Sequence, residues 1–324
     1  FNKTNLQTIA GTETLLRTHM GLSISDNLDG ILNWIKGEDV YDEDTDPSTT
    51  LRSHIMGDPL HSRPLAINYG CTPEATCTPD LRIVVGTNSG FLHMFEDSGD
   101  TVDENWAVIP YPLLANQKAL LDNLDSSSHI YGVDSSPVVL VNEKVRDGVI
   151  KSSDGDKVWI YTGLRSGGNA YYAMDISSPD MPKYMWTIDN TIAGFELLGQ
   201  TWSLPEVAFI PGYNDSNGKA KPVLIFAGGY DVAKSALGQG TSDSMGQGIY
   251  IVDAESGALV FSASPAKATT INKEVAEMSY SMPGSVALLD GDVDGRTDRI
   301  YATDTGGNIW RMDSKGADKS KWSI

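Results

Sequence analysis

The stretch that decides the fold is Arg299-Ile-Tyr-Ala-Thr-Asp-Thr-Gly-Gly-Asn-Ile-Trp-Arg-Met-Asp313. It consists of a short apolar and aromatic run, a turn that contains glycine, and a second such run that ends on an acidic residue. β-branched and aromatic side chains favour strands, and a glycine-containing turn between two such runs is typical of a β-hairpin. We therefore predict a pair of antiparallel strands here.

The same unit occurs earlier in the chain, which indicates a repeat architecture. The earlier copies are residues 82–96, residues 158–163 with 170–175, and residues 223–228 with 248–253. Several copies continue into one more strand-like run, at residues 105–109, 184–188 and 258–262. A repeat of this kind predicts a series of small sheets along the chain, each made of several short strands.

A proline followed by an apolar run precedes each copy. These prolines are Pro64, Pro137, Pro205 and Pro283, about 70 residues apart. Proline suits the first residue of a strand, where its missing N–H costs no ladder hydrogen bond. Four strands per repeat at this spacing is typical of a β-propeller, whereas a β-sandwich does not predict a repeated pair of motifs. We predict an all-β fold: a partial β-propeller of about four long four-stranded blades, cut short after Asp313 and belonging to a larger propeller.

The first 55 residues have a different pattern. Apolar residues at helical spacing run through residues 6–20, and a second helix is predicted over residues 27–36. The acidic residues 39–47 follow, and a solvated linker is favoured over a second cation site because the glycine of a calcium loop is missing. We therefore predict a helical and acidic lead-in over residues 1–55 and propeller blades over residues 56–324.

An acidic loop lies directly before the opening stretch: Asp290-Gly-Asp-Val-Asp-Gly-Arg-Thr-Asp298. Acidic side chains stand at loop positions 1, 3, 5 and 9 and glycine at position 6, as in the first part of an EF-hand calcium loop. Calcium takes oxygen ligands, and without a cation the four carboxylates would repel one another. The match ends at position 12, where an EF-hand has glutamate and this chain has Tyr301. We predict a Ca²⁺ loop at residues 290–298 whose ligands are Asp290, Asp292, Asp294, Asp298 and the backbone carbonyl of Arg296.

The alternative for this loop is a solvated Asp-Gly turn, which the four matching acidic positions disfavour. A second alternative concerns the role of the ion. A bound calcium ion can regulate the protein or simply join two strands, and the residues leave both roles open.

The charge balance excludes some classes of partner. The chain has 324 residues and a formal net charge of -19, whereas phosphate-rich partners require clustered lysine and arginine. We therefore expect no binding to nucleic acid or to anionic membrane surfaces. No apolar run approaches the roughly 20 residues of a membrane-spanning helix, so we predict no transmembrane segment. The chain starts at Phe1 without a signal region, so we expect a processed or excised piece.

The chain has only two cysteines, Cys71 and Cys77, which lie in a turn-rich segment. A zinc site needs about four ligands, and no histidine or further cysteine lies close by in the sequence. We predict a disulfide that closes a small loop, and hence an oxidising compartment, rather than two free thiols.

Several ordered motifs together resemble one known family. They are residues 61–70, 84–95, 131–137, 163–175, 198–205 and 290–298. From about residue 31 onward the chain resembles the C-terminal propeller of the PilY/PilC family of type IV pilus tip adhesins and biogenesis factors. In that family the matching acidic loop binds calcium, and calcium occupancy tunes the balance between pilus extension and retraction. The resemblance implies the same ligands as the loop pattern does.

The resemblance also implies a function. It predicts a non-catalytic, secreted protein that reaches the pilus tip or the outer-membrane surface of a Gram-negative bacterium through the periplasm. Such proteins promote pilus assembly, oppose retraction, and contribute to twitching motility, virulence and adhesion to host cells or abiotic surfaces. The implied partners are pilin subunits and minor pilins.

Two other functions use the same fold class. A quinone-dependent dehydrogenase is also a propeller with calcium, but that class has short regular blades and adjacent cysteines, and here Cys71 and Cys77 are not adjacent. A propeller that serves as a scaffold in envelope assembly is the third reading. The chain has no Gly-x-Ser-x-Gly motif and no metal-binding histidine pair, so we predict no enzyme activity.

Overall fold

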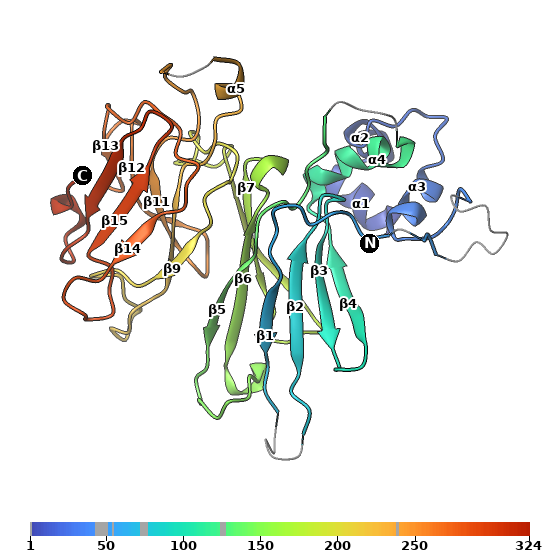
Figure 1. Cartoon of the computed structure of the whole chain (residues 1–324), viewed down its shortest axis with the longest axis horizontal. Helices are drawn as coiled ribbons and strands as arrows, with labels where there is room; N and C mark the ends of the chain where they lie inside the picture. The colour runs from blue at the N-terminus through green and yellow to red at the C-terminus, as the bar shows by residue number, and fades with distance from the viewer. Residues whose placement is uncertain (1, 43–50, 54, 72–76, 124–127, 238–239) are drawn as a thin grey trace.

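The structure, a computed structural model, describes residues 2–42, 51–53, 55–71, 77–123, 128–237 and 240–324. Its strands form four separate sheets that follow one another along the chain (Figure 1), and we call them blades 1 to 4. Within each blade the strands are neighbours in chain order, which is the meander of a propeller blade. The predicted propeller-like, mostly β fold is confirmed.

The strands have the following bounds. Blade 1 contains β1 (Leu65–Asn68), β2 (Leu81–Gly86), β3 (Leu92–Asp97) and β4 (Val102–Val108). Blade 2 contains β5 (Val138–Asn142), β6 (Lys157–Gly163), β7 (Ala170–Asp175) and β8 (Lys183–Asp189). Blade 3 contains β9 (Glu206–Ala208), β10 (Val223–Ala227), β11 (Ile249–Asp253), β12 (Leu259–Ser264) and β13 (Asn272–Glu274). Blade 4 contains β14 (Ala287–Leu289), β15 (Arg299–Thr303) and β16 (Ile309–Asp313).

The repeated prolines mark where blades begin. Pro64, Pro137 and Pro205 stand immediately before β1, β5 and β9, whereas Pro283 lies a few residues before β14. A serine two residues before the proline accepts a hydrogen bond from the end of the second strand of the blade: Ser62 Oγ from Gly86 N at 2.9 Å, and Ser203 Oγ from Ala227 N at 3.0 Å. This contact fixes the chain entering a blade against the strand beside it.

The cores lie between neighbouring blades. In β6, Val158 and Ile160 pack in the core shared with blade 1, whereas Trp159 and Tyr161 pack in the core shared with blade 3. β10 behaves in the same way, with alternate residues in the cores on its two sides. Because side chains alternate across a strand, a strand that is apolar on both faces is buried on both faces. The uninterrupted apolar runs of the sequence therefore place blades 2 and 3 in the middle of the array.

The prediction of four strands per blade is right for blades 1 and 2 and wrong for blade 3, and blade 4 is cut short after Asp313 as predicted. Blade 3 has a fifth strand, β13, which pairs with β12 in parallel. The buried amide of Asn272 holds it there, since Asn272 Oδ1 accepts hydrogen bonds from Ser262 Oγ and Ser264 Oγ at 2.8 and 2.9 Å. Blade 4 has three strands, and a bridge between Asp313 and Ser323 adds a single pairing beyond β16.

The helices are short and lie mainly near the N-terminus. They are α1 (Lys3–Ala10), α2 (Glu13–His19), α3 (Leu28–Ile35), η1 (Tyr111–Asn116), α4 (Gln117–Asp122), η2 (Ser152–Asp154), η3 (Arg165–Gly167), α5 (Lys234–Leu237) and η4 (Lys319–Lys321). Figure 1 shows α1 to α4 together at one end of blade 1. Their buried side chains form a core of their own, which includes Leu16, Ile31 and Leu114. None of the described helices is long and apolar enough to cross a membrane.

The single helical run expected over residues 6–20 is instead two helices. Gly11 has φ +92°, which ends α1, and the Thr12 hydroxyl accepts a hydrogen bond from Leu15 N at 3.1 Å to start α2. As a result Ile9 and Leu15, expected on the apolar stripe, are 64% and 54% exposed. The helix predicted over residues 27–36 is α3, which matches the prediction closely and has Asn27 as its N-cap. Residues 43–47 of the acidic linker lie outside the described residues.

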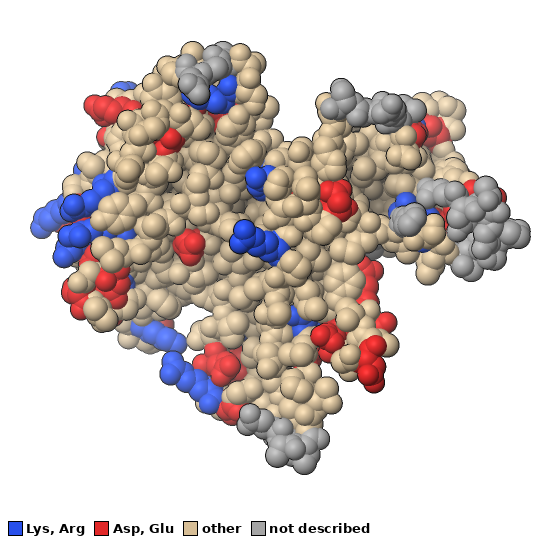
Figure 2. Space-filling model, in the orientation of Figure 1, with Lys and Arg blue, Asp and Glu red and all other residues tan. Residues whose placement is uncertain are grey.

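Cys71 and Cys77 form a disulfide in the connection between β1 and β2. On the face shown in Figure 2, acidic and basic side chains lie interspersed, with basic ones gathered at the edge near the C-terminus. This face of the described residues has no broad basic surface of the kind that nucleic acid requires.

Candidate metal centre

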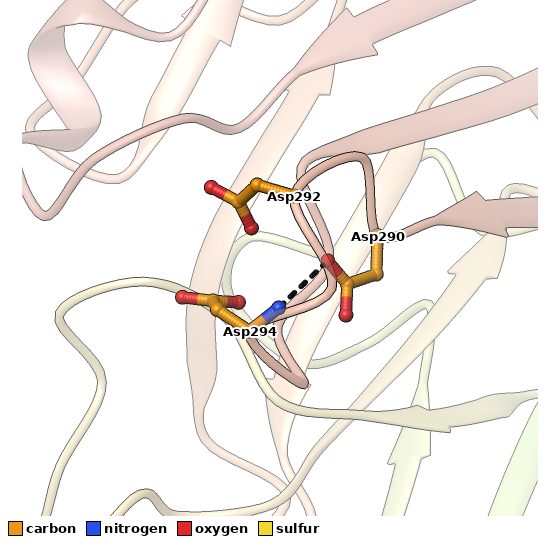
Figure 3. A group of neighbouring side chains, drawn as sticks. All are labelled: Asp290, Asp292 and Asp294. Carbon is orange, nitrogen blue, oxygen red and sulfur yellow. Dashed lines mark hydrogen bonds between the residues drawn. The ribbon is translucent and has the colours of Figure 1, made fainter.

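The acidic loop connects β14 to β15, which pair antiparallel, as the sequence predicted. It brings Asp290, Asp292 and Asp294 together, each with a carboxylate oxygen within 4.8 Å of the others. Figure 3 shows the three side chains around one turn of the loop, with an Asp290 oxygen facing the N–H of Asp294. Among the histidine, cysteine, aspartate and glutamate side chains of the described residues, these three aspartates form the group that lies close enough together to hold an ion.

Asp290 organises the backbone of the loop. Its carboxylate accepts hydrogen bonds from Val293 N at 2.7 Å, Asp294 N at 3.2 Å and Gly295 N at 2.8 Å. Desolvation opposes ionisation, but these backbone donors outweigh it and hold the pKa of Asp290 below its ordinary value. Val293 and Gly295 have φ of +64° and +84°, and these left-handed residues wind the chain around the carboxylate. Asp290 is therefore a charged acceptor at neutral pH.

Asp298 is placed differently from the other three acids. It is buried, its Oδ2 accepts a hydrogen bond from Gly291 N at 2.8 Å, and it is not a member of the three-acid cluster. Its backbone is held on both sides, by Leu289 O at 2.9 Å and Ser314 N at 2.7 Å. The structure thus assembles Asp290, Asp292 and Asp294, while Asp298 closes the base of the loop. Its predicted role as a ligand stays a prediction.

Arg296 joins the loop to blade 3. Its Nη1 donates to Ile210 O at 3.0 Å, and both terminal nitrogens lie 3.4 Å from Asn214 Oδ1. The neighbouring Thr297 N donates to Phe209 O at 2.8 Å. The carbonyl of Arg296, the predicted ligand, accepts no hydrogen bond from any described residue. The residue therefore has its side chain on blade 3 and a backbone oxygen left for another partner.

The sequence gives no sign of these blade 3 contacts. Ile210 and Asn214 lie in the connection between β9 and β10, where Gly212–Ala220 only superficially resembles a phosphate-binding loop. In the structure this segment is a hairpin turn, with Asp215 N donating to Lys219 O at 2.7 Å and Asn214 bridged to Ala220. A carbonyl and an amide are present in every loop of this type, so residue pattern alone cannot select them.

The donor set fits a hard divalent cation. Three carboxylates lie close together. Among the described residues, the basic side chain that pairs with them is Arg296, whose Nε lies 4.0 Å from Asp294 Oδ2. Carboxylate and carbonyl oxygens are the ligands that Ca²⁺ takes, at coordination numbers of about 6 to 8. The cluster and the free carbonyl provide part of that number, and water can supply the rest. The arrangement is suited to binding a cation.

Comparison with known proteins assigns the family. The model of the PilY1 β-propeller domain matches residues 58–322, which is most of the chain. The chain belongs to the PilY1 β-propeller family. The resemblance stated from the sequence motifs is thereby confirmed.

Relatives of the PilY1 family are distant in sequence. The type IV pilus biogenesis factor PilY1 of Pseudomonas aeruginosa (strain UCBPP-PA14) is 27% identical over 283 residues, which is 82% of this chain and 21% of that protein. A PilY1 homolog of Xylella fastidiosa is 26% identical over 255 residues, or 75% of this chain and 14% of that protein. The chain therefore spans 14% to 21% of the length of these two relatives.

A solved structure of the PilY1 family is also similar. The crystal structure of the Pseudomonas aeruginosa PilY1 C-terminal domain matches with a TM-score of 0.47 and 26% identity. The match covers 74% of this chain and 40% of that one.

Proposed function

We propose that this chain is a non-catalytic, calcium-binding domain of a type IV pilus biogenesis factor. Membership of the PilY1 family supports the role in pilus biogenesis. The three-acid cluster at Asp290, Asp292 and Asp294 is the observation that supports calcium. The loop carries oxygen donors at EF-hand positions and little compensating positive charge, so a cation removes the repulsion between its carboxylates.

Calcium in this loop braces blade 4 against blade 3. The ion supplies positive charge at the centre of the loop and draws the carboxylates and the Arg296 carbonyl inward. Because the Arg296 guanidinium bonds to Ile210 O and Asn214, the same residue serves the ion with its backbone and blade 3 with its side chain. Asp298 keeps the base of the loop closed through Gly291 N. Calcium then stabilises the pairing of two blades rather than one turn.

The protein of which this domain is a part acts at the pilus tip or on the outer-membrane surface. It promotes pilus assembly and opposes retraction, with pilin subunits and minor pilins as partners. Twitching motility and adhesion to host-cell or abiotic surfaces follow from that position.

The test of the ion site is calcium titration calorimetry on the purified chain and on a variant with Asp290, Asp292 and Asp294 all changed to asparagine. We expect a dissociation constant near the range of extracellular calcium modules, about 10⁻⁴ to 10⁻³ M, and loss of binding in the variant. The matched control changes Asp97, Asp100 and Asp103 to asparagine, at the end of β3, in the turn that follows and at the start of β4. It should bind like the unaltered chain. An absence of calcium-dependent heat from the folded, unaltered chain contradicts the site.

The test of the pilus role places the same triple changes in the complete gene and measures surface piliation and twitching. Loss of either property in the loop variant alone supports calcium control of the pilus. Normal piliation and twitching in a strain whose protein no longer binds calcium contradicts that role but leaves the ion site standing.

A further inference from the structure

A second candidate site lies outside the acidic loop, where connections of blades 1, 2 and 3 meet. It is a cleft of about 410 Å³, and its lining includes His61, Tyr131, Arg165, Gln200, Trp202 and Tyr230. This volume is in the range of small-molecule sites. The rim includes Ser235 of α5, which Figure 1 shows at the same end of the molecule as the N-terminal helices. The cleft collects residues that are far apart in sequence.

A fixed aromatic group forms one side of the cleft. The ring of Trp202 stacks with Tyr230, with centroids 4.7 Å apart, and the Arg165 guanidinium carbon lies 4.3 Å from the Trp202 ring centroid. The indole Nε1 donates to Gln200 Oε1 at 3.2 Å, and Gln200 Nε2 donates to Ser166 O at 3.0 Å. These contacts hold the rings in place before any ligand arrives, so binding loses little side-chain freedom.

The arginine at the cleft is paired with a buried carboxylate. Asp134, which is buried, accepts from Arg165 Nη1 at 3.1 Å and from His61 Nδ1 at 2.9 Å. The Nη1 of Arg165 is thus held by this carboxylate and by Ser166 Oγ at 3.3 Å, so the positive charge at the cleft faces a buried negative one. Because the charges of Arg165 and Asp134 offset each other, a charged ligand gains less Coulomb attraction here than at a lone charge, which favours a neutral ligand.

Uncharged hydrogen-bonding groups remain available. Since a carboxylate only accepts, His61 Nδ1 carries the proton of its bond to Asp134, and His61 Nε2 has no hydrogen-bond partner among the described residues. The hydroxyl of Tyr131 likewise has none in the described part of the chain, and Tyr131 lies beside His61 with ring centroids 6.3 Å apart. The cleft therefore offers aromatic surfaces together with neutral donors and acceptors.

The backbone at the cleft is constrained. Arg165 has φ +51°, a left-handed conformation that is uncommon for a residue other than glycine and that persists only where the surroundings enforce it. The same turn passes so close to the connection between blades 1 and 2 that a Cβ on Gly167 would stand 1.9 Å from Gly132 O. These two features keep Arg165 over Trp202 and maintain the shape of the cleft.

We propose that this cleft binds a neutral saccharide. Sugars combine apolar C–H faces, which pack on aromatic rings, with hydroxyl groups that bond to neutral donors and acceptors such as tyrosine, histidine and glutamine. The size, the neutral balance of charge and the fixed rings all match that chemistry. This inference is independent of the calcium loop and adds a ligand to the proposed pilus role.

The test is saturation-transfer NMR and tryptophan fluorescence with three neutral disaccharides: lactose, cellobiose and N,N′-diacetylchitobiose. We expect at least one to bind with a dissociation constant of about 1 mM or tighter. Tyr131→Ala and Tyr230→Ala should each weaken binding about tenfold, because each removes an aromatic surface that contacts the sugar. Tyr131→Phe, which removes only the hydroxyl, should weaken it by a smaller factor.

The matched control is Tyr184→Ala, on the outer strand β8, where Tyr184 is 67% exposed and outside the cleft. It should bind like the unaltered chain, and near-ultraviolet circular dichroism checks that each variant is folded. The proposal is overturned if none of the three sugars binds at 20 mM, an excess of about twentyfold over the expected constant. It is equally overturned if the two folded cleft variants bind as tightly as the control.

Discussion

Replacing Arg296 by methionine separates calcium binding from its effect on blade 3. The change removes the guanidinium and keeps a stem of similar length. The predicted calcium ligand at this position is the backbone carbonyl, which methionine also provides. The hydrogen bonds to Ile210 O and Asn214 Oδ1 are lost. We therefore expect the dissociation constant for calcium to change by less than about threefold, since no ligand atom is removed.

The cost in stability follows from the same contacts. Ile210 is fully buried, and without the guanidinium its carbonyl keeps only Tyr213 N, at 3.4 Å, so the loss of the charged donor costs about 1–2 kcal/mol. The Arg296 side chain is 26% exposed, so water replaces part of the lost bonding. We expect the free energy of unfolding without calcium to fall by about 1–2 kcal/mol.

The calcium-dependent protection that passes from the loop to blade 3 is a more specific measurement than the change in stability. At a calcium concentration 100 times the dissociation constant, binding stabilises the folded loop by about 2.7 kcal/mol, or about 100-fold in an opening equilibrium. In the unaltered chain part of this protection should reach Tyr213 N and Lys221 N, whose hydrogen bonds lie within the β9–β10 connection. Hydrogen exchange of these two amides, with and without calcium, measures it. In Arg296→Met the calcium-dependent protection should remain in the loop and disappear from blade 3.

The matched control is Arg311→Met, which removes an arginine of the same blade that pairs with Asp313. Its calcium-dependent protection of blade 3 should equal that of the unaltered chain. Equal protection of Tyr213 and Lys221 in Arg296→Met would show that the coupling runs elsewhere. Loss of calcium binding in Arg296→Met would show that the side chain, not the carbonyl, supports the ion.

Three further substitutions test the base of the acidic loop, a closely packed glycine and a buried carboxylate. Asp298→Ala removes the acceptor of Gly291 N, and we expect at least a tenfold loss of calcium affinity in titration calorimetry with the circular dichroism of the blades unchanged. Gly257→Ala should lower the free energy of unfolding in urea by about 1–3 kcal/mol, because Gly257 has φ +72° and the new Cβ would stand 2.8 Å from the Trp186 ring. The control is Gly218→Ala, which is also at positive φ but has open space around it and should therefore cost less. Burial opposes ionisation of Asp253, but hydrogen bonds from Lys221 and Tyr213 outweigh the burial and lower the pKa of Asp253 in the folded protein. The carboxylate therefore contributes fully to the free energy of unfolding above its unfolded pKa of about 3.9, and this contribution is lost as the pH falls through its folded pKa. Asp253→Asn should therefore flatten the decline of unfolding free energy in acid, and an unchanged decline contradicts this assignment.

Much of the fold was predictable from local pattern. The apolar runs that became β6 and β10 are buried on both faces, and the prolines mark the starts of three blades. These signals are local, because the alternation of a strand and the geometry of proline depend on a few consecutive residues. The strand count of blade 3 was not predictable in the same way. The addition of β13 depends on Asn272 reaching Ser262 and Ser264 across a turn.

The sequence by itself determined most of the strands, the order of the repeats and the acidic loop, including the grouping of Asp290, Asp292 and Asp294 within one turn. Only the tertiary structure decided what that loop touches, since Arg296 reaches Ile210 across the boundary between two blades. It also decided the cleft, where Asp134 of one connection meets Trp202 of another through Arg165. The physical reason is that hydrogen bonding and side-chain period specify a strand locally, whereas contacts between blades depend on how separate sheets pack face to face.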